Sequence, residues 1–334
     1  MHRILRATVL VLLCVLVVDI TGIRAQENID FPDLTGDYQV GRAVYHFVDD
    51  DPEGIFSTDP IIPVDLRDLT VTVYYPAEIS PDARPAPYVP ERIELLGEPV
   101  VDYERVSIHA YADVPVSSDQ TSHPLLLFYP GGYMDSFLYA ALLEEVASHG
   151  YVVACISPWY IDGVDWGELG DVWVLGMIFT ANQLVALNRD DPLLAGSVDM
   201  TRVGAFGHSF GGAVAAEAAH RDQRFLAALN MDGGLFGDVV ESGIDRPFMM
   251  MLSDRSWQTD RQLDDLGITR DGFEERGSRK DAQGRVLVES APAGYLVTPQ
   301  GFGHLSFSDF LLLVVLLANP RRIDCEGKGY TLGQ

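Results

Sequence analysis

Basic residues are scarce in this chain of 334 residues, which has 23 Lys and Arg against 49 Asp and Glu and a formal net charge of −26 at pH 7. A chain with this excess of negative charge repels nucleic acid and anionic membrane surfaces. The composition therefore argues against a nucleic-acid partner and favours a neutral or zwitterionic small molecule as the ligand. It leaves the oligomeric state open.

Cysteine is also rare, since the chain has only Cys14, Cys155 and Cys325. The sequence has no Cys/His spacing typical of a metal site, no H-E-x-x-H motif and no phosphate-binding glycine-rich loop. We therefore expect neither a metal nor any other cofactor. If Cys14 is removed with a leader segment, two cysteines remain. A Cys155–Cys325 disulfide and a buried free thiol at Cys155 both stay open.

Long hydrophobic runs are missing as well. The apolar run at residues 7–18 follows Arg3 and Arg6 and is too short to span a bilayer comfortably, which is typical of a secretory signal peptide. We predict a signal peptide at residues 1–25 and a mature chain, 26–334, that is secreted or periplasmic and has no membrane span. An uncleaved N-terminal membrane anchor is the alternative.

Short apolar runs without polar alternation are typical of parallel strands that are buried on both faces. Strands are expected from Pro124 onward at 125–129, 151–156, 202–206, 225–231, 247–252 and 293–297, and helices at 137–149, 177–188, 211–220 and 306–318. The alternating, β-branched and aromatic run at 69–75 predicts one more strand. The alternation of strands and helices predicts one α/β domain with a doubly wound, mostly parallel sheet flanked by helices. Ligand sites in such sheets lie at the carboxyl ends of the strands. Whether residues 254–304 fold over that end as a lid is open.

The motif Gly207-His-Ser-Phe-Gly211 matches G-x-S-x-G, between an expected strand and an alanine-rich helix. The tight turn thrusts the serine hydroxyl above the sheet and leaves room only for glycine two residues away on either side. We therefore predict that Ser209 is a nucleophile and that the Phe210 N–H is one donor to an oxyanion. The second donor is expected from Gly132 or Tyr133, in the turn after the strand at 125–129.

A serine hydroxyl needs a base to become a good nucleophile. In this architecture the chain order is serine, acid, histidine. His304 stands after the last expected strand and is the predicted base, whereas His208 is expected to point away from the site. Asp232 and Asp254 each follow an expected strand. The residue pattern alone leaves open which of the two is the acid.

Several segments resemble the platelet-activating factor acetylhydrolase family and its bacterial dienelactone-hydrolase-like relatives. They are Gly-His-Ser-Phe-Gly-Gly at 207–212, Leu229-Asn-Met-Asp-Gly-Gly-Leu-Phe236, Ala147-Ser-His-Gly-Tyr-Val-Val153, Gly303-His-Leu-Ser-Phe-Ser-Asp-Phe310 and Tyr74-Tyr-Pro-Ala77. The resemblance covers roughly residues 36–320 in the same order. It implies the α/β-hydrolase fold of the α/β-hydrolase superfamily, and it implies Asp232 as the acid.

The resemblance further implies a serine esterase that works through an acyl-enzyme, on small-molecule or lipid esters such as short sn-2 acyl groups of phospholipids. The chain departs from the family at Tyr129-Pro-Gly-Gly-Tyr133, where the vertebrate enzymes carry His-Gly. Polyester hydrolases and cutinases have a comparable turn, so a general carboxylesterase or polyester hydrolase is the alternative. A non-catalytic binding module on this fold is a third hypothesis. Trp159, Trp166 and Trp173 are expected in one long loop, where they either line an acyl or lipid pocket or pack under the loop.

Overall fold

The computed structural model describes residues 28–50, 54–56, 68–91, 102–158, 164–256, 260–265 and 267–318. The predicted signal peptide, Trp159 and Cys325 lie outside the described residues. Cys155 is buried, and its thiol lies 3.6 Å from the carbonyl oxygen of Ser136. Whether it pairs with Cys325 therefore stays open, and the limit of the single domain at 26–334 stays a prediction.

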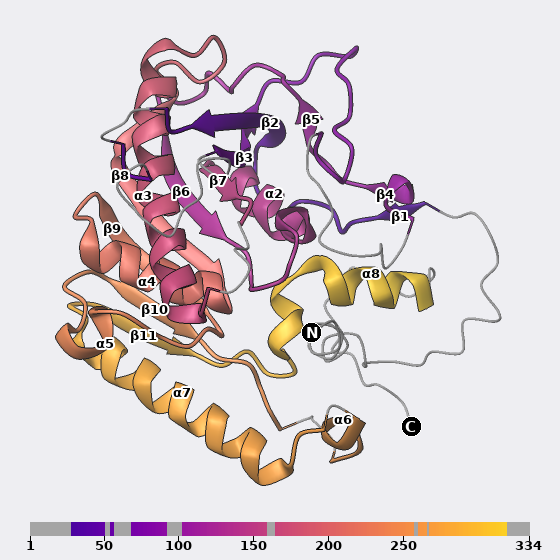
Figure 1. Ribbon diagram of the computed structural model, residues 1–334. Helices are drawn as coiled ribbons and strands as arrows, with labels where there is room; N and C mark the ends of the chain where they lie inside the picture. Colours follow the sequence, from indigo (N-terminus) through magenta and orange to yellow (C-terminus); the bar gives the residue numbers. More distant parts are fainter. Residues whose placement is uncertain are drawn as a thin grey trace.

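Nine strands of the described chain form one sheet, in the order β11-β10-β9-β8-β6-β7-β3-β2-β5 (Figure 1). Their bounds are β2 (Gln39–Val48), β3 (Asp68–Ala77), β5 (Tyr111–Ala112), β6 (His123–Tyr129), β7 (Val152–Ile156), β8 (Val198–His208), β9 (Phe225–Met231), β10 (Phe248–Met251) and β11 (Gly294–Val297). β1 (Ile29–Asp30) and β4 (Val106–Ser107) form a separate parallel pair. The run from β7 through β6 to β11 is parallel, and β3 pairs antiparallel with both β7 and β2. The predicted mostly parallel sheet is confirmed.

Helices cover both faces of the sheet (Figure 1). α3 (Trp166–Asp190), α4 (Phe210–Arg221), α5 (Val239–Ser242) and α7 (Arg270–Ser290) lie on one face, and α2 (Ala140–Ser148) and α8 (Asp309–Ala318) on the other. Short 3₁₀ turns, η3 (Tyr103–Arg105), η4 (Ser136–Tyr139) and η5 (His304–Phe307), and the short helix α6 (Asp260–Asp265) complete the described elements. Each face of the sheet thus has its own hydrophobic core.

Strand β6 contributes side chains to both hydrophobic cores. Leu125 and Leu127 pack into the core under α3 and α4, whereas Phe128 packs into the core under α2. Successive side chains of a strand point to opposite faces, so a continuous apolar run is needed where both faces are covered. Burying each such side chain contributes roughly 1.5–3 kcal/mol.

α3 begins eleven residues earlier than the helix predicted at 177–188. Asp165 caps it by accepting hydrogen bonds from the N–H groups of Gly167 and Glu168, at 2.7 and 3.1 Å. Trp166 and Trp173, expected in a loop, therefore lie on the helix. Among the described residues, α3 alone has the length and apolar composition of a membrane span, but most of its apolar part is buried inside the fold. It is best described as a core helix.

The segment 254–304 contains α6, α7 and β11, and α7 was not predicted. Thr269 caps α7 by accepting from the N–H of Gly272 at 3.1 Å. The helix packs on β10, where a β-carbon on Gly284 would lie 3.2 Å from the side chain of Met250. Glycine and polar side chains dominate its sequence, so the apolar periodicity that identifies a packed helix is weak.

Candidate active site

Ser209 stands between β8 and α4 with a strained backbone, at φ 53° and ψ −120°. A β-carbon on Gly207 would lie 2.3 Å from the backbone of Gly211, and one on Gly211 would lie 2.2 Å from the carbonyl oxygen of Tyr129. Both contacts are impossible, which explains glycine at both positions. The Ser209 N–H donates to the Met231 carbonyl at 2.8 Å, so the neighbouring strand holds the turn.

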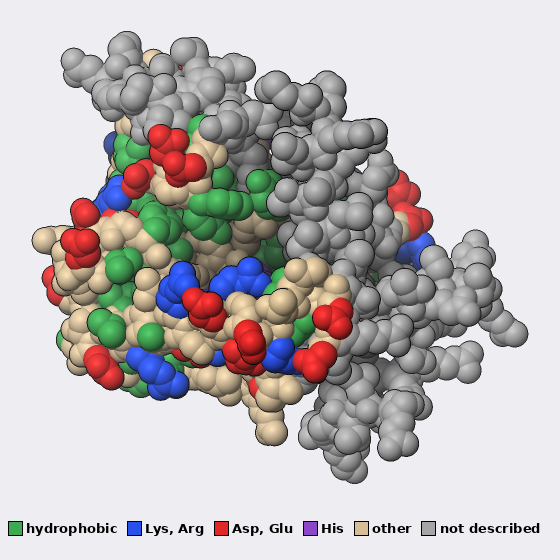
Figure 2. All heavy atoms as spheres, turned by 60° about the horizontal axis from the view of Figure 1, so that its bottom comes forward, with side chains coloured by type: hydrophobic (Ala, Val, Ile, Leu, Met, Phe, Trp, Pro, Cys, Tyr) green, Lys and Arg blue, Asp and Glu red, His purple; other side chains and the backbone are tan. Residues whose placement is uncertain are grey.

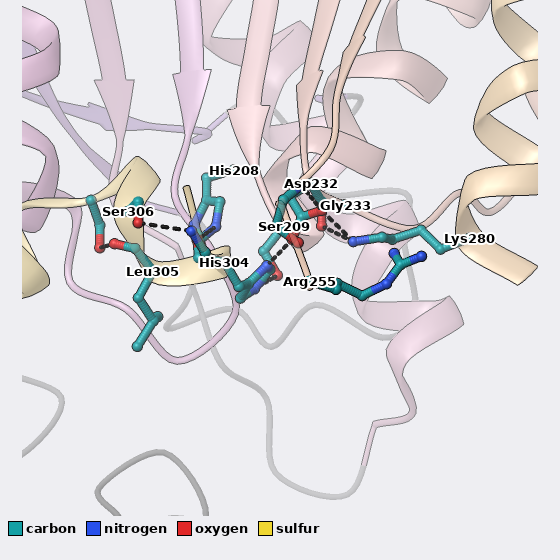
Figure 3. A network of polar contacts seen from close by, with 12 residues as sticks. His208, Ser209, Asp232, Gly233, Arg255, Lys280, His304, Leu305 and Ser306 are labelled. Carbon is teal, nitrogen blue, oxygen red and sulfur yellow. Dashed lines mark hydrogen bonds and ion pairs between the residues drawn. The ribbon is translucent and has the colours of Figure 1, made fainter. Parts of the chain in front are cut away.

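His304 joins Ser209 to Asp232 (Figure 3). Its Nε2 lies 3.1 Å from Ser209 Oγ, and its Nδ1 lies 2.5 Å from Asp232 Oδ2. The consistent proton assignment has the Ser209 hydroxyl donating to Nε2 and Nδ1–H donating to the carboxylate. These three residues come from the ends of β8 and β9 and from the start of η5, at the carboxyl edge of the sheet.

Asp232 is almost fully buried, with its side chain 1% exposed. Its Oδ1 accepts from the Ser253 N–H at 2.8 Å and from the Lys280 ammonium, and its own N–H donates to the Met251 carbonyl at 2.8 Å. Burial raises the pKa of the Asp232 carboxyl, but the hydrogen bond from His304 and the charge of Lys280 outweigh it and hold that pKa well below its usual range. Asp232 is therefore an ionised, fixed acceptor for His304.

Asp254, the other candidate acid, has different partners. Its carboxylate accepts from the N–H groups of Gly301 and Ser256, at 3.0 and 2.9 Å, and its own N–H donates to the Phe302 carbonyl at 2.6 Å. The hydrogen bonds from Gly301 and Ser256 lower the pKa of this carboxyl. Asp254 thus fastens the loop that leads to His304, and the structure brings Asp232 to the imidazole instead.

His208 has a contact that the sequence did not predict. It is buried, its Nδ1 lies 2.7 Å from the Tyr139 hydroxyl, and its Nε2 lies 2.8 Å from the carbonyl oxygen of His304. Burial and the nearby His304 hold the pKa of His208 well below its usual range, so the ring is neutral. The expectation that His208 points away from the site is wrong, because its ring packs against that of His304 with centroids 4.6 Å apart.

The predicted oxyanion donors lie beside one another. Phe210 is the first residue of α4, where N–H groups have no partner within the helix. A β-carbon on Gly132 would lie 3.8 Å from that of Phe210, which places this turn next to the start of α4. Tyr133 follows with a positive φ of 58°. The neighbouring Gly131 N–H donates to the Tyr139 hydroxyl oxygen at 2.9 Å.

Aromatic side chains surround this turn. Trp166 packs edge-on against Phe210 and against Tyr133, with centroids 4.8 and 5.3 Å apart. Trp166 and Tyr133 are 46% and 55% exposed, whereas Trp173 is buried and stacks on Tyr129. Figure 2 shows hydrophobic side chains gathered in a hollow of the surface, with acidic and basic side chains around it. Trp166 is thus an exposed ring beside the turn at Gly132, and Trp173 packs in the core against Phe210.

A separate apolar cavity of about 710 Å³ lies on the α2 and α8 face of the sheet. Met231, Phe248, Met251, Phe302, Phe307 and Leu312 are among its lining residues, and Ser209 and His304 are not. Part of its lining comes from the loop that carries His304. The described residues contain no cluster of three or more His, Cys, Asp or Glu side chains that would hold a metal ion.

The strand order, the strained serine turn and the positions of Asp232 and His304 define the α/β-hydrolase fold. A solved structure of a ferulic acid esterase from Streptomyces cinnamoneus superposes with a TM-score of 0.67, covering 89% of this chain and 84% of that chain at 24% sequence identity. The predicted fold class is confirmed.

Sequence comparison narrows the relationship. Residues 180–319 match the family described as platelet-activating factor acetylhydrolase, isoform II, which confirms the resemblance inferred from the motifs. A probable 1-alkyl-2-acetylglycerophosphocholine esterase from Arthroderma benhamiae is 29% identical over 181 residues, 46% of each chain. A platelet-activating factor acetylhydrolase from Cavia porcellus is 25% identical over 195 residues, 46% of this chain and 44% of the relative. The chain thus matches somewhat under half the length of each of these relatives.

Proposed function

We propose that this chain is a serine carboxylic-ester hydrolase, with Ser209 as nucleophile, His304 as general base and Asp232 as the acid that orients it. The observation that carries the proposal is the continuous contact from Ser209 Oγ to His304 Nε2, at 3.1 Å, and from His304 Nδ1 to Asp232, at 2.5 Å. A nucleophile, a base and an orienting carboxylate in this relation are what acyl transfer requires.

In the acylation step, His304 takes the Ser209 proton as Oγ attacks the ester carbonyl carbon. The tetrahedral intermediate collapses when the imidazolium gives that proton to the leaving alcohol, and an acyl-Ser209 ester remains. Asp232 fixes the tautomer that presents Nε2 to the serine and stabilises the imidazolium. Its low pKa suits this role, because the carboxylate stays ionised while His304 cycles.

In the deacylation step, His304 takes a proton from water, which attacks the acyl-serine and releases the acid and the free hydroxyl. The negative oxygen of both intermediates is held by the Phe210 N–H and by an N–H of Gly132 or Tyr133. Each such donor contributes roughly 3–4 kcal/mol to the transition state. The mechanism calls on no cofactor.

The first candidate substrate is a short acyl group on a phospholipid-like alcohol. The names of the Arthroderma and Cavia relatives support this choice, as does the match at residues 180–319. The excess of negative charge on the chain suits a zwitterionic headgroup better than an anionic one. The turn that contains Gly132 and Tyr133 is called the oxyanion turn here, after the donor that it is proposed to supply. The Trp166 ring beside it leaves little room for a long acyl chain.

The second candidate is a general carboxylesterase or polyester hydrolase. It is favoured by the exposed pair of Tyr133 and Trp166, whose rings would stack on an aromatic ester. The ferulic acid esterase with the same fold points in this direction too. A purely binding role on this fold is disfavoured by the intact contact between Ser209, His304 and Asp232.

We further propose that the chain is exported, with residues 1–25 as its signal peptide, and that it acts as a secreted or periplasmic enzyme. The basic start and short apolar run support export. A form tethered by an uncleaved N-terminal anchor is the alternative, and N-terminal sequencing of the exported protein separates the two.

The test of function compares kcat/KM for a 2-acetyl glycerophosphocholine with kcat/KM for p-nitrophenyl acetate. Ser209→Ala serves as the blank and should lose nearly all activity while keeping its fold. Comparable or higher values on the lipid support the first substrate class, and activity on the simple ester alone supports the second. If neither ester is hydrolysed and a fluorophosphonate probe does not label Ser209, the esterase proposal is wrong.

A further inference from the structure

The ammonium of Lys280 lies against the carboxylate that orients His304 (Figure 3). Lys280 Nζ donates to Asp232 Oδ1 and, at 3.2 Å, to the carbonyl oxygen of the same residue. The two oxygens of the carboxylate therefore have different partners. Oδ2 accepts from His304, whereas Oδ1 accepts from Lys280 and the Ser253 N–H. Rotation of the carboxylate would break contacts on both sides.

Lys280 is unusual in this chain, which has 21 arginines but only two lysines, Lys280 and Lys328. Lys328 lies outside the described residues. An ammonium is a compact charge with three donors, so it fits between the two oxygens of Asp232 that it contacts. A guanidinium is larger and its donors lie in a fixed plane. The one lysine in the described part of the chain stands where the shape of its charge matters.

The position of α7 is fixed by contacts on either side of Lys280. Arg255, just after β10, makes a two-pronged ion pair with Asp281 at 2.9 and 2.6 Å. A β-carbon on Gly277 would lie 2.4 Å from the Arg255 guanidinium, and Gly284 lies against Met250. The two glycines flank Lys280 on one stripe of the helix and let it approach the strand closely.

We propose that Lys280 is a positioning residue for His304, acting through Asp232: it fixes the carboxylate in the rotamer that His304 requires and balances its charge. The inference rests on the proposed function, but its effect on the protonation of His304 can be measured without an enzyme assay. Lys280 is not itself a catalytic residue, because its contacts in the site are with Asp232 alone.

The Lys280 charge acts on the protonation of His304 in a definite direction. Asp232 faces His304 and Lys280, with the charge of Arg255 acting on it from further away and Arg255 itself paired with Asp281. On its other side His304 meets the neutral ring of His208. Removing the Lys280 charge leaves a lone buried carboxylate beside the imidazole, so protonation of His304 becomes easier.

The test follows the imidazole titration of His304 by NMR in the full chain, with His304→Gln used to assign its signals among the eight histidines. In Lys280→Met the midpoint should rise by about one pH unit, in the range that a neighbouring charge produces. Lys280→Arg, which keeps the charge, should move it less. Arg279→Met is the matched control, since Arg279 pairs with Glu275 on the exposed side of the same helix. Equal midpoints in Lys280→Met and the wild type would overturn the proposal.

A second variant tests the route through the carboxylate. In Asp232→Asn/Lys280→Met the carboxylate is removed as well, so the midpoint should fall below that of Lys280→Met, where the unbalanced carboxylate favours the imidazolium. A midpoint in the double variant as high as in Lys280→Met would contradict the proposed route.

Ester hydrolysis then separates the two proposals. Lys280→Met should lower kcat between about 10- and 100-fold, as loss of an outer partner does, with KM little changed. If the wild type hydrolyses no ester while the midpoint still moves, the proposed function fails and the positioning role stands. If the wild type is active and neither the midpoint nor kcat moves, the positioning role fails and the proposed function stands.

Discussion

His208 Nε2 donates to the carbonyl oxygen of His304 at 2.8 Å, so the residue before the proposed nucleophile holds the backbone of the proposed base. The Tyr139 hydroxyl donates to the other ring nitrogen of His208 and accepts from the Gly131 N–H. A single chain of hydrogen bonds therefore links the oxyanion turn, the serine turn and the loop of His304. Geometry at one of these places depends on the other two.

His208→Phe tests this link. The ring volume is kept, but the Tyr139 hydroxyl loses its histidine acceptor and the His304 carbonyl loses its histidine donor. We expect about a tenfold fall in kcat and a loss of roughly 1–3 kcal/mol in the free energy of unfolding, measured in urea. Tyr139→Phe, which removes one hydroxyl, should show a smaller effect. Wild-type kcat and stability in His208→Phe would refute the link.

The choice of acid is tested by two matched amides. Asp232→Asn presents the wrong hydrogen-bond partner to His304 and should lower kcat by roughly 10³- to 10⁴-fold. Asp254→Asn keeps an acceptor oxygen for the Gly301 N–H and should cost less than about tenfold. The measurement is kcat on p-nitrophenyl acetate for both variants. A larger loss in Asp254→Asn would make Asp254 the acid.

Acyl-chain length is expected to depend on Trp166. A β-carbon on Gly132 would lie 2.8 Å from this indole, so the ring fills the space above the oxyanion turn. In Trp166→Ala, kcat/KM on p-nitrophenyl esters should rise with chain length relative to acetate, by up to about fourfold for each methylene that enters the space. Val185→Ala, on an exposed part of the same helix, is the control. An unchanged length preference in Trp166→Ala would place the acyl group elsewhere.

Stability should depend on pH through Asp309, which accepts from the Tyr88 hydroxyl at 3.1 Å and from the Ala141 N–H at 3.3 Å. Burial, with repulsion from Glu144, raises the pKa of Asp309 to about 8. The folded protein therefore keeps a proton that the unfolded chain releases above its ordinary pKa of about 4. From there to about pH 8 this group lowers the free energy of unfolding as pH rises, by up to about 1.4 kcal/mol per pH unit.

Asp309→Asn removes that titration. Urea unfolding of both proteins at pH 5, 6.5 and 8 should show the wild type losing stability relative to the variant as pH rises. If the two pH profiles run parallel, Asp309 does not titrate in this range.

The central strands were predicted well, because a strand that is buried on both faces has a continuous apolar sequence. The predicted strand 225–231 coincides with β9, and 151–156 with β7 to within one residue. The helices α3 and α7 were harder to predict from the sequence. The first turns of α3 are rich in glycine and charge, and α7 packs through Gly277 and Gly284, which carry no hydrophobic signal. Packing by small residues is visible only once the partner strand is known.

Some residues of the candidate site could likewise be predicted from the sequence, and others could not. Motif and order pointed to Ser209 and His304, and the structure brings both together with Asp232. Asp232 and Asp254 were equal by position at strand ends, and only the tertiary partners separate them, His304 for one and Gly301 for the other. Lys280 and His208 gave no signal, because each contributes through a contact whose partner is remote in the chain.

The long sequence separation within the site has a consequence for biosynthesis. Ser209 and His304 are 95 positions apart. At about 5–20 residues per second, roughly 5–20 seconds of translation separate the two. During that interval the emerging chain carries the serine turn without its base, and Lys280 also arrives after Asp232. On the proposed mechanism, a nascent or truncated chain that stops before β11 lacks its base and should not hydrolyse esters.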